Sequence, residues 1–204
     1  MIYNKNNFII ASLCPGDYGR YYLDGVHVTP KYTEVTNGHY LMRVQAPVQA
    51  KEDLPEIENH KIIKEDVKPF TFPAKASMQV ANSIPTNQRT LKQLEHTWIT
   101  ENSNEEEVEF ITTDLEVKTP IKANKLEGKF WAHTQAVFDN GDEKEVILST
   151  GFNVDYMLKI CQLLKKMKLK GVKLEMYGEK EAMRLTGKTA SEQEVKILLM
   201  PMVI

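Results

Sequence analysis

Hydrophobic and polar positions alternate in short runs over most of the chain, which is typical of β-strands separated by turns. The runs that predict strands are residues 8–13, 21–28, 33–36, 39–46, 70–72, 93–100, 107–113, 116–119, 144–149, 172–176, 182–186 and 195–200. The Asn37-Gly38 pair between two of these runs is the strongest hairpin signal, since both residues tolerate the positive φ of tight turns. The pattern therefore predicts mainly antiparallel strands.

Two segments instead follow the period of a helix. In residues 74–84 the apolar side chains recur at helical spacing, and a proline stands at each end. Residues 154–168 follow Asn153, a candidate N-cap. Their expected buried stripe consists of Val154, Met157, Leu158, Cys161, Leu164 and Met167. Because each helix follows a short strand and precedes three more, residues 70–130 and 144–204 share the order β–α–β–β–β.

The repeated order predicts an α+β fold in which antiparallel sheets carry helices on one face. We expect residues 1–50 to form a mostly β, partial unit without a helix, and residues 51–69 to form a linker of mixed charge. Residues 70–138 would be a second unit, and residues 139–204 a third that ends in an apolar strand. A length of 204 residues suits one domain or two small ones.

Composition narrows the possible functions. The chain is 42% hydrophobic and 26% charged, as ordinary globular proteins are. A net charge of -2 excludes a uniformly basic coat for nucleic acid, although it allows a basic face. Two cysteines, Cys14 and Cys161, are too few for a disulfide framework, and we expect reduced thiols. No apolar run is long enough for a membrane span and the N-terminus lacks a signal-peptide pattern, so we expect a cytoplasmic protein.

The sequence offers no catalytic constellation. No two of the five histidines have the spacing of a helical zinc site, and there is no phosphate-binding loop, nucleophile elbow or dinucleotide fingerprint. Acidic residues fall in turns and in charge-alternating strands, where solvated surface explains them. We therefore expect no enzymatic activity, no metal and no cofactor.

Two features point to binding instead. The second predicted helix and the residues after it carry five lysines: Lys159, Lys165, Lys166, Lys168 and Lys170. Lysines late in a helix favour its dipole, yet this density also suits a phosphate backbone, and both interpretations stay open. The chain also ends in eight apolar residues, 197–204. A buried last strand explains the first of these, whereas an apolar tail with methionines after Pro201 suits one wall of a peptide groove.

These segments together resemble the bacterial sliding clamp, the β subunit of the replicative DNA polymerase. The similar stretches are residues 20–26 with 35–41, residues 72–75 with the following helix, residues 124–130, residues 151–158 and residues 198–202. They occur in the family's order nearly from end to end. The pair GFNVDYML and MPM, at residues 151–158 and 200–202, is the most specific.

The sequence also departs from the family. It is shorter, and the resemblance leaves out the N-terminal domain, the first helix of the middle domain and the first half of the last domain. Tyr40 stands where the family has arginine, Asn37 where it has aspartate, and Trp131 where it has proline. Val203 and Ile204 replace the terminal arginine and leucine.

The resemblance implies a non-enzymatic processivity factor that associates with duplex DNA and docks linear motifs of polymerases and similar partners. By position, its peptide groove would consist of Leu23, Thr36, Gly38, His39, Leu41, Trp131, Leu198, Met200, Pro201, Met202, Val203 and Ile204. The five lysines named above would face DNA, and homo-oligomers are possible. The alternative is a clamp-like module that binds peptides or a host clamp without encircling DNA. An enzyme on an unrelated α+β fold is the third hypothesis.

Overall fold

The computed structural model describes residues 2–15, 23–47, 68–85, 94–100, 105–114, 116–127, 134–139 and 150–202. The strands are β1 (Ile2–Asn4), β2 (Gly25–Val28), β3 (Tyr32–Thr36), β4 (Tyr40–Gln45), β5 (Phe70–Pro73), β6 (His96–Thr100), β7 (Glu107–Thr113), β8 (Lys118–Asn124), β9 (Lys173–Glu175), β10 (Met183–Lys188) and β11 (Glu194–Leu199). The helices are α1 (Lys5–Ile9), the 3₁₀ helix η1 (Ile10–Leu13), α2 (Ala74–Ser83), α3 (Thr134–Asp139) and α4 (Val154–Lys166).

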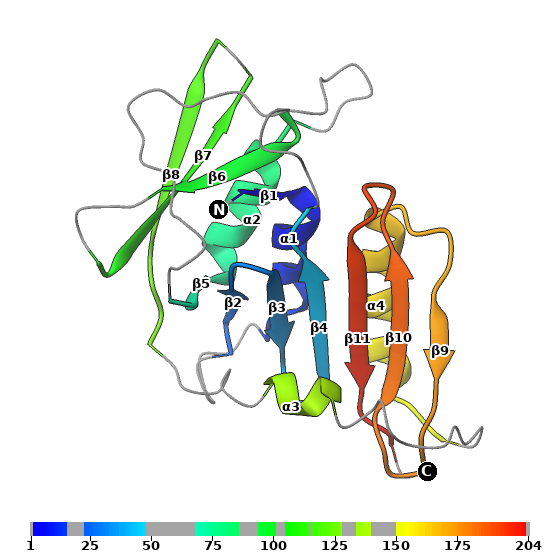
Figure 1. The fold of residues 1–204 in the computed structure, drawn as a ribbon. Helices are drawn as coiled ribbons and strands as arrows, with labels where there is room; N and C mark the ends of the chain where they lie inside the picture. The colour runs from blue at the N-terminus through cyan, green and yellow to red at the C-terminus, as the bar shows by residue number, and fades with distance from the viewer. Residues whose placement is uncertain are drawn as a thin grey trace.

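The strands form two antiparallel sheets, as the alternating pattern predicts (Figure 1). One sheet has the order β1-β6-β7-β8, and the other has the order β5-β2-β3-β4-β11-β10-β9. The longer sheet continues from β4 directly into β11, so it joins residues 2–124 to residues 150–202. Helices α1, α2 and α4 contribute to the core on one side of it, and the short helix α3 lies on the other.

The hairpin predicted at Asn37-Gly38 is confirmed. β3 pairs with β4 from Tyr32 opposite Gln45 to Thr36 opposite Leu41. Gly38 has a φ of 86°, a conformation that a Cβ atom disfavours, and this explains glycine at the tip of the turn. The Thr36 hydroxyl accepts a hydrogen bond from the Gly38 N–H at 3.1 Å and donates one to the Tyr40 carbonyl at 2.6 Å. The turn is therefore held by its own side chains.

The strand predicted for residues 8–13 is wrong, because this segment forms α1 and η1. Asn4 caps the helix by accepting a hydrogen bond from the Asn6 N–H at 3.0 Å, and the Asn7 side chain accepts one from the Asn4 N–H at 3.3 Å. A short helix buried on nearly all sides has a continuous apolar run, which periodicity cannot distinguish from a strand. The first fifty residues therefore do contain a helix.

The same order of elements occurs in successive parts of the chain. Residues 2–45 and residues 70–124 each contain a strand, a helical segment and three strands. In the third part, α4 is followed by β9, β10 and β11. An isolated bridge between Gly151 and Met202 repeats the one between Thr71 and Leu126 in the second part. The third part therefore follows the plan of the second, while the exact domain boundaries given above stay a prediction.

The core between the sheets is centred on Phe8 of α1. Its ring makes edge-on contacts with Tyr3, Phe72 and Phe110, at centroid distances of 6.1, 6.2 and 5.6 Å. All four side chains are fully buried. Since they come from β1, α1, β5 and β7, this cluster holds the two sheets and their helices together.

Helices α2 and α4 lie where the sequence predicts them, but the buried face of α4 differs from the predicted stripe. Ile160 and Leu163 are buried instead, together with the predicted Leu164 and Met167. Three predicted members of the stripe, Val154, Leu158 and Cys161, are exposed, the first two by 72% and 54%. The buried face is therefore rotated from the predicted stripe, and Val154, Leu158 and Cys161 form a second, exposed apolar group on this helix.

Most remaining strands lie within a few residues of their predicted places. The largest shift is at β8, which runs from Lys118 to Asn124 instead of ending at residue 119. The strand predicted for residues 144–149 and most of the linker predicted for residues 51–69 lie outside the described residues.

Candidate functional site

Three of the predicted groove residues lie side by side on the face of the seven-stranded sheet that is opposite α1 and α4. Directly opposed residues in neighbouring antiparallel strands point to the same side. Thr36 of β3 is opposite Leu41 of β4, and Leu41 is opposite Leu198 of β11. We call these three residues the apolar row. Sequence positions 36, 41 and 198 are thus brought into contact by strand register alone.

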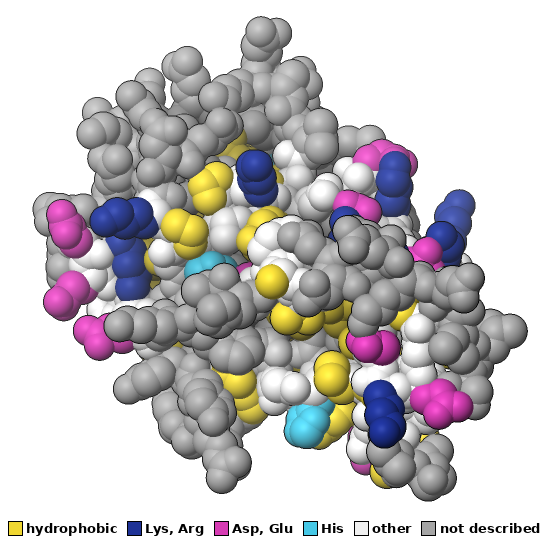
Figure 2. Space-filling model, turned by 60° about the horizontal axis from the view of Figure 1, so that its bottom comes forward, with side chains coloured by type: hydrophobic (Ala, Val, Ile, Leu, Met, Phe, Trp, Pro, Cys, Tyr) yellow, Lys and Arg dark blue, Asp and Glu magenta, His cyan; other side chains and the backbone are white. Residues whose placement is uncertain are grey.

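Next to the apolar row, the β3–β4 turn and the residues after β11 form an exposed surface, at the lower end of the molecule in Figure 1. The Met200 N–H donates to the His39 carbonyl at 2.9 Å, which fastens the chain after β11 to the β3–β4 turn. Met200 and Met202 are 46% and 49% exposed, and Gly38 and His39 are also exposed. Figure 2 shows hydrophobic side chains reaching the surface at this end, with a histidine beside them.

The chain's own α3 covers part of the predicted groove. Phe138 packs on Leu41 and Leu198, and the three side chains are only 5–7% exposed. Two polar contacts fasten α3 to the sheet: the Thr134 hydroxyl donates to Glu34 at 2.9 Å, and Arg43 donates to Gln135 at 2.8 Å. The open part of the groove therefore consists of the turn and the methionines after β11.

A row of polar side chains runs beside the apolar row. His27 of β2, Glu34 of β3, Arg43 of β4 and Lys196 of β11 are opposed in turn across four strands. Arg43 donates through Nε and Nη2 to Glu34 Oε2, at 3.0 and 2.8 Å. Burial raises the pKa of Glu34, while the Arg43 guanidinium and the Thr134 hydroxyl act to lower it.

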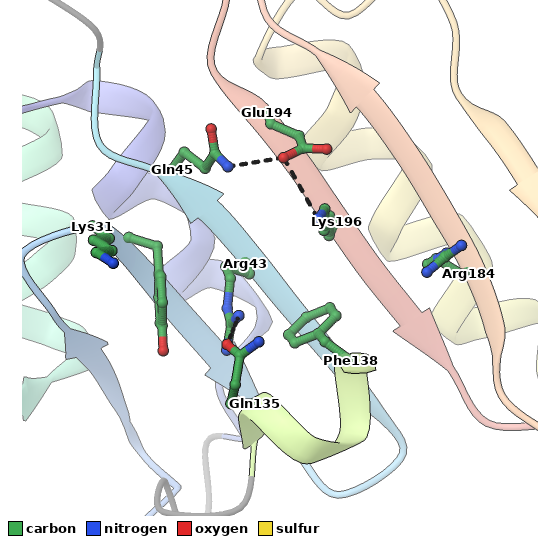
Figure 3. A pocket seen from close by; sticks show the side chains of 9 residues that line it. Lys31, Arg43, Gln45, Gln135, Phe138, Arg184, Glu194 and Lys196 are labelled. Carbon is green, nitrogen blue, oxygen red and sulfur yellow. Dashed lines mark hydrogen bonds and ion pairs between the residues drawn. The ribbon is translucent and has the colours of Figure 1, made fainter. Parts of the chain in front are cut away.

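A cavity of about 370 Å³ opens beside Phe138 on this face (Figure 3). Its lining side chains are Lys31, Tyr32, Arg43, Gln45, Gln135, Phe138, Arg184, Glu194 and Lys196. The Arg43 guanidinium carbon lies 3.7 Å from the centre of the Tyr32 ring and 4.2 Å from that of Phe138, so it is held between two aromatic rings. Gln45 donates to Glu194 at 2.8 Å. This wall is polar and already well paired.

The remaining predicted groove residues contribute unequally. Leu23 is 6% exposed and Pro201 is partly exposed. Trp131, Val203 and Ile204 lie outside the described residues. Prediction from sequence missed Glu34, Arg43 and Phe138. The predicted turn at Asn37-Gly38 would place residue 34 opposite residue 41, so the pairing of Glu34 with Arg43 appears only with the observed turn at Gly38-His39.

The five lysines predicted to face DNA are all exposed. Lys159, Lys165 and Lys166 lie on α4, and Lys168 and Lys170 follow it. Asn153 caps the helix as predicted, with its side chain accepting from the Tyr156 N–H at 3.1 Å. Four of these five lysines lie in the last turn of α4 or after it, where the helix dipole also favours cations.

Within the described part of the chain, no group of histidine, cysteine and acidic side chains is arranged to hold a metal ion. No helix among the described residues is long and apolar enough to cross a membrane. Cys14 and Cys161 are both free thiols, and burial raises the pKa of Cys14 to about 12, so this group is a thiol near neutral pH.

Comparison with solved structures identifies the fold. The DNA polymerase sliding clamp from Pseudomonas aeruginosa matches with a TM-score of 0.64 and 14% identity, over 100% of this chain and 66% of that one. The sliding clamp from Bacillus subtilis gives a TM-score of 0.61 and 13% identity, over 100% of this chain and 64% of that one. The Helicobacter pylori β clamp gives 0.61 and 9%, over 98% and 64%.

No protein-family model and no curated protein matches this sequence. The chain spans just under two thirds of the length of the clamps it matches. At these identities the likeness concerns architecture, and it agrees with the predicted α+β fold of antiparallel sheets with helices. The chain therefore has a divergent sliding-clamp fold.

Removing one partner of the Glu34–Arg43 pair is expected to destabilise the fold. Arg43→Met leaves a fully buried carboxylate without its cation, which costs about 3–5 kcal/mol. Adding Glu34→Leu should recover most of this loss. Urea unfolding measures both. Lys188→Met, which breaks an exposed ion pair with Glu192 at 3.4 Å, is the control and should change little. Equal losses in the single and double variants would contradict a charge effect.

Stability should also fall in acid because of His27. Burial, followed by the nearby Arg43 charge, lowers the pKa of His27 from 6.5 to about 4. Between these values the unfolded chain binds a proton that the folded chain does not, so the free energy of unfolding falls as the pH drops. Over the whole pH range between the two pKa values, this effect lowers the free energy of unfolding by about 3 kcal/mol.

His27→Gln should remove this part of the pH dependence. Gln at this position keeps a polar group near the Thr71 hydroxyl, which lies 3.1 Å from His27 Nδ1. Urea unfolding at pH 7 and at pH 4.5 tests the difference between the two proteins, since other groups titrate equally in both. Identical losses in the wild type and the variant would show that His27 does not titrate in this way.

Proposed function

We propose that this chain is a reduced, non-enzymatic clamp-like protein that docks short apolar peptide motifs and associates with duplex DNA. The observation that carries the proposal is the meeting of the β3–β4 turn with the end of β11, on a fold similar to sliding clamps over the whole chain. These are the two segments in which the sequence resembles the peptide groove of the clamp family.

The chemistry of this surface suits an apolar peptide. Met200 and Met202 are flexible, polarizable side chains that adapt to different partners. The turn beside them exposes backbone at Gly38 and the imidazole of His39, whose ring lies 5.2 Å from that of Tyr156. An extended segment could place apolar side chains on the methionines and hydrogen-bond its backbone to the turn.

Phe138 sets a condition on this docking. Because its ring already packs on Leu41 and Leu198, a peptide must either bind beside it or displace it. Displacement also removes the ring from the Arg43 guanidinium, whose carbon lies 4.2 Å from the ring centre, while Arg43 can still donate to Glu34. The ring therefore acts as a competitor that lowers the affinity for peptides at the apolar row.

The lysines of α4 support the association with DNA. Lys159, Lys165 and Lys166 are exposed on one helix, and phosphate contacts need charge density without a sequence motif. Among the helices that the structure describes, α4 carries the densest group of cations. Helix α2, for comparison, carries only Lys75. This uneven distribution favours the second candidate function, a module that docks peptides or another clamp without encircling DNA.

Met200→Asp is expected to weaken peptide binding at least about tenfold, because it places a charge on the apolar wall. Phe138→Ala should strengthen binding, since the peptide no longer competes with the ring. Fluorescence anisotropy with a labelled peptide carrying a bacterial polymerase clamp-binding motif measures both. Val117→Asp, at a 58% exposed apolar position away from the groove, is the matched control. No saturable binding by the wild type would refute the peptide proposal.

The double variant Lys165→Glu, Lys166→Glu should weaken duplex-DNA binding and reduce the dependence on salt by about two phosphate contacts. Lys118→Glu with Lys122→Glu makes the same charge change on β8 and should have less effect. Anisotropy of a labelled duplex over a salt series is the measurement. If the wild type binds no DNA even at low salt while peptide binding persists, the non-encircling module is the correct function.

A further inference from the structure

The first two parts of the chain show how units of this plan pair. Residues 2–45 and residues 70–124 exchange their first strands, since β1 pairs with β6 and β5 pairs with β2. Their helical segments pack together: the Ser77 hydroxyl of α2 donates to the Phe8 carbonyl of α1 at 3.0 Å, a buried contact. Each unit therefore completes the core of the other.

The third part has no such counterpart among the described residues. The matching bridges at Thr71 and Gly151 align Phe72 with Phe152, and the helices that begin at Ala74 and Val154 align in turn. Phe72 is fully buried in the paired unit, whereas Phe152 is 37% exposed. The aligned positions thus differ in burial although both carry phenylalanine.

The same difference recurs along the helix and the next strand. Ala81 of α2 is fully buried, while the aligned Cys161 is exposed. Ile99 of β6, opposite the core residue Phe110, is also fully buried. Its counterpart Leu174 of β9, opposite the core residue Leu185, is 43% exposed. Three exposed apolar positions of the third part, Phe152, Cys161 and Leu174, therefore align with positions that are buried in the paired unit.

The chain has no room for the missing unit at this place. Between the end of β8 at Asn124 and the start of α4 at Val154 lie only residues 125–153, and α3 takes up residues 134–139 of these. A complete unit of this plan extends over residues 70–124. Residues 125–153 are therefore too few to form a counterpart for the third part.

We propose that a second copy of this chain covers this surface, by pairing its third part with the same third part through a two-fold axis. We define the pairing surface as Phe152, Val154, Leu158, Cys161 and Leu174. In residues 2–124 two units of the same plan already pair reciprocally, which is the geometry of a two-fold interface. The pair would form a complete clamp-type domain from two incomplete halves.

Charge on α4 fits this arrangement. Its first turn carries Asp155 and its last turn carries Lys165 and Lys166. If the two-fold axis is perpendicular to α4, the two copies of the helix run antiparallel, and the acidic start of one lies near the basic end of the other. A parallel arrangement would instead bring the lysines of both copies together. In the antiparallel arrangement, the charges at the two ends of α4 are thus complementary to themselves.

Light scattering coupled to size exclusion, over about a hundredfold range of concentration, tests the proposal. The wild type should reach twice the chain mass of 23.4 kDa at the upper end and approach 23.4 kDa on dilution. Leu158→Asp should stay at 23.4 kDa throughout, because two carboxylates would face each other near the axis. Leu174→Lys is the second variant, and Val117→Asp is the control that should still dimerise. Circular dichroism checks that each variant is folded.

A wild type that stays at 23.4 kDa throughout would overturn the proposal, as would a dimer that survives both Leu158→Asp and Leu174→Lys. If the monomeric wild type instead forms a complex with a full-length bacterial clamp, the surface binds another clamp and the second copy is excluded. These outcomes are independent of peptide and DNA binding, since neither ligand is present.

Discussion

The antiparallel pairing of β4 with β11 is the contact on which the rest of the structure depends. It runs from Val44 opposite Val195 to Tyr40 opposite Leu199, and it joins the first two parts of the chain to the third. A slip of one residue would move every side chain of β11 to the other face. Gln193, which is fully buried just before β11, helps to fix the register: it donates to Asn7 of α1 at 3.1 Å and to the Gln45 carbonyl at 2.9 Å.

On the face of the seven-stranded sheet that carries α3, this register places the apolar row beside a row of polar side chains. The two rows have different roles. The apolar row binds Phe138 through contacts that have little directionality, whereas the Glu34–Arg43 pair presents hydrogen-bonding groups in fixed directions. Thr134 and Gln135 of α3 contact this pair, so polar groups define where the helix lies and Phe138 adds apolar burial. A buried ion pair adds little net stability, and this one instead specifies the position of α3 through its contacts with Thr134 and Gln135.

The parts of the fold that local signals determine were predictable from sequence. Gly38 marks the hairpin, and Asn153 marks the start of α4, because each acts through its immediate neighbours. The helix at residues 5–13 was missed because its apolar side chains are buried on nearly all sides and its cap consists of asparagines. The buried face of α4 was missed for a different reason: which stripe packs inward depends on which units are present, and the sequence of one helix does not contain that information. For the groove, the sequence could supply candidate positions. It could not show that Phe138 covers Leu41 and Leu198, because that contact depends on tertiary structure.

The third part of the chain remains folded without a counterpart because its core lies elsewhere. Ile160 and Leu163 of α4 belong to the main core, and Tyr156 contacts Tyr40 of β4 at a ring distance of 5.8 Å. The exposed face therefore costs the fold little, and its free energy is available for association. Covering four or five half-exposed apolar side chains contributes on the order of 1 kcal/mol each, which is comparable to the lower estimates of the entropy lost when two molecules associate. These magnitudes favour a dimer that forms and dissociates with concentration over a permanent one. Reversible association of this kind would let the lysines of α4 and the methionines after β11 be presented by either one chain or two.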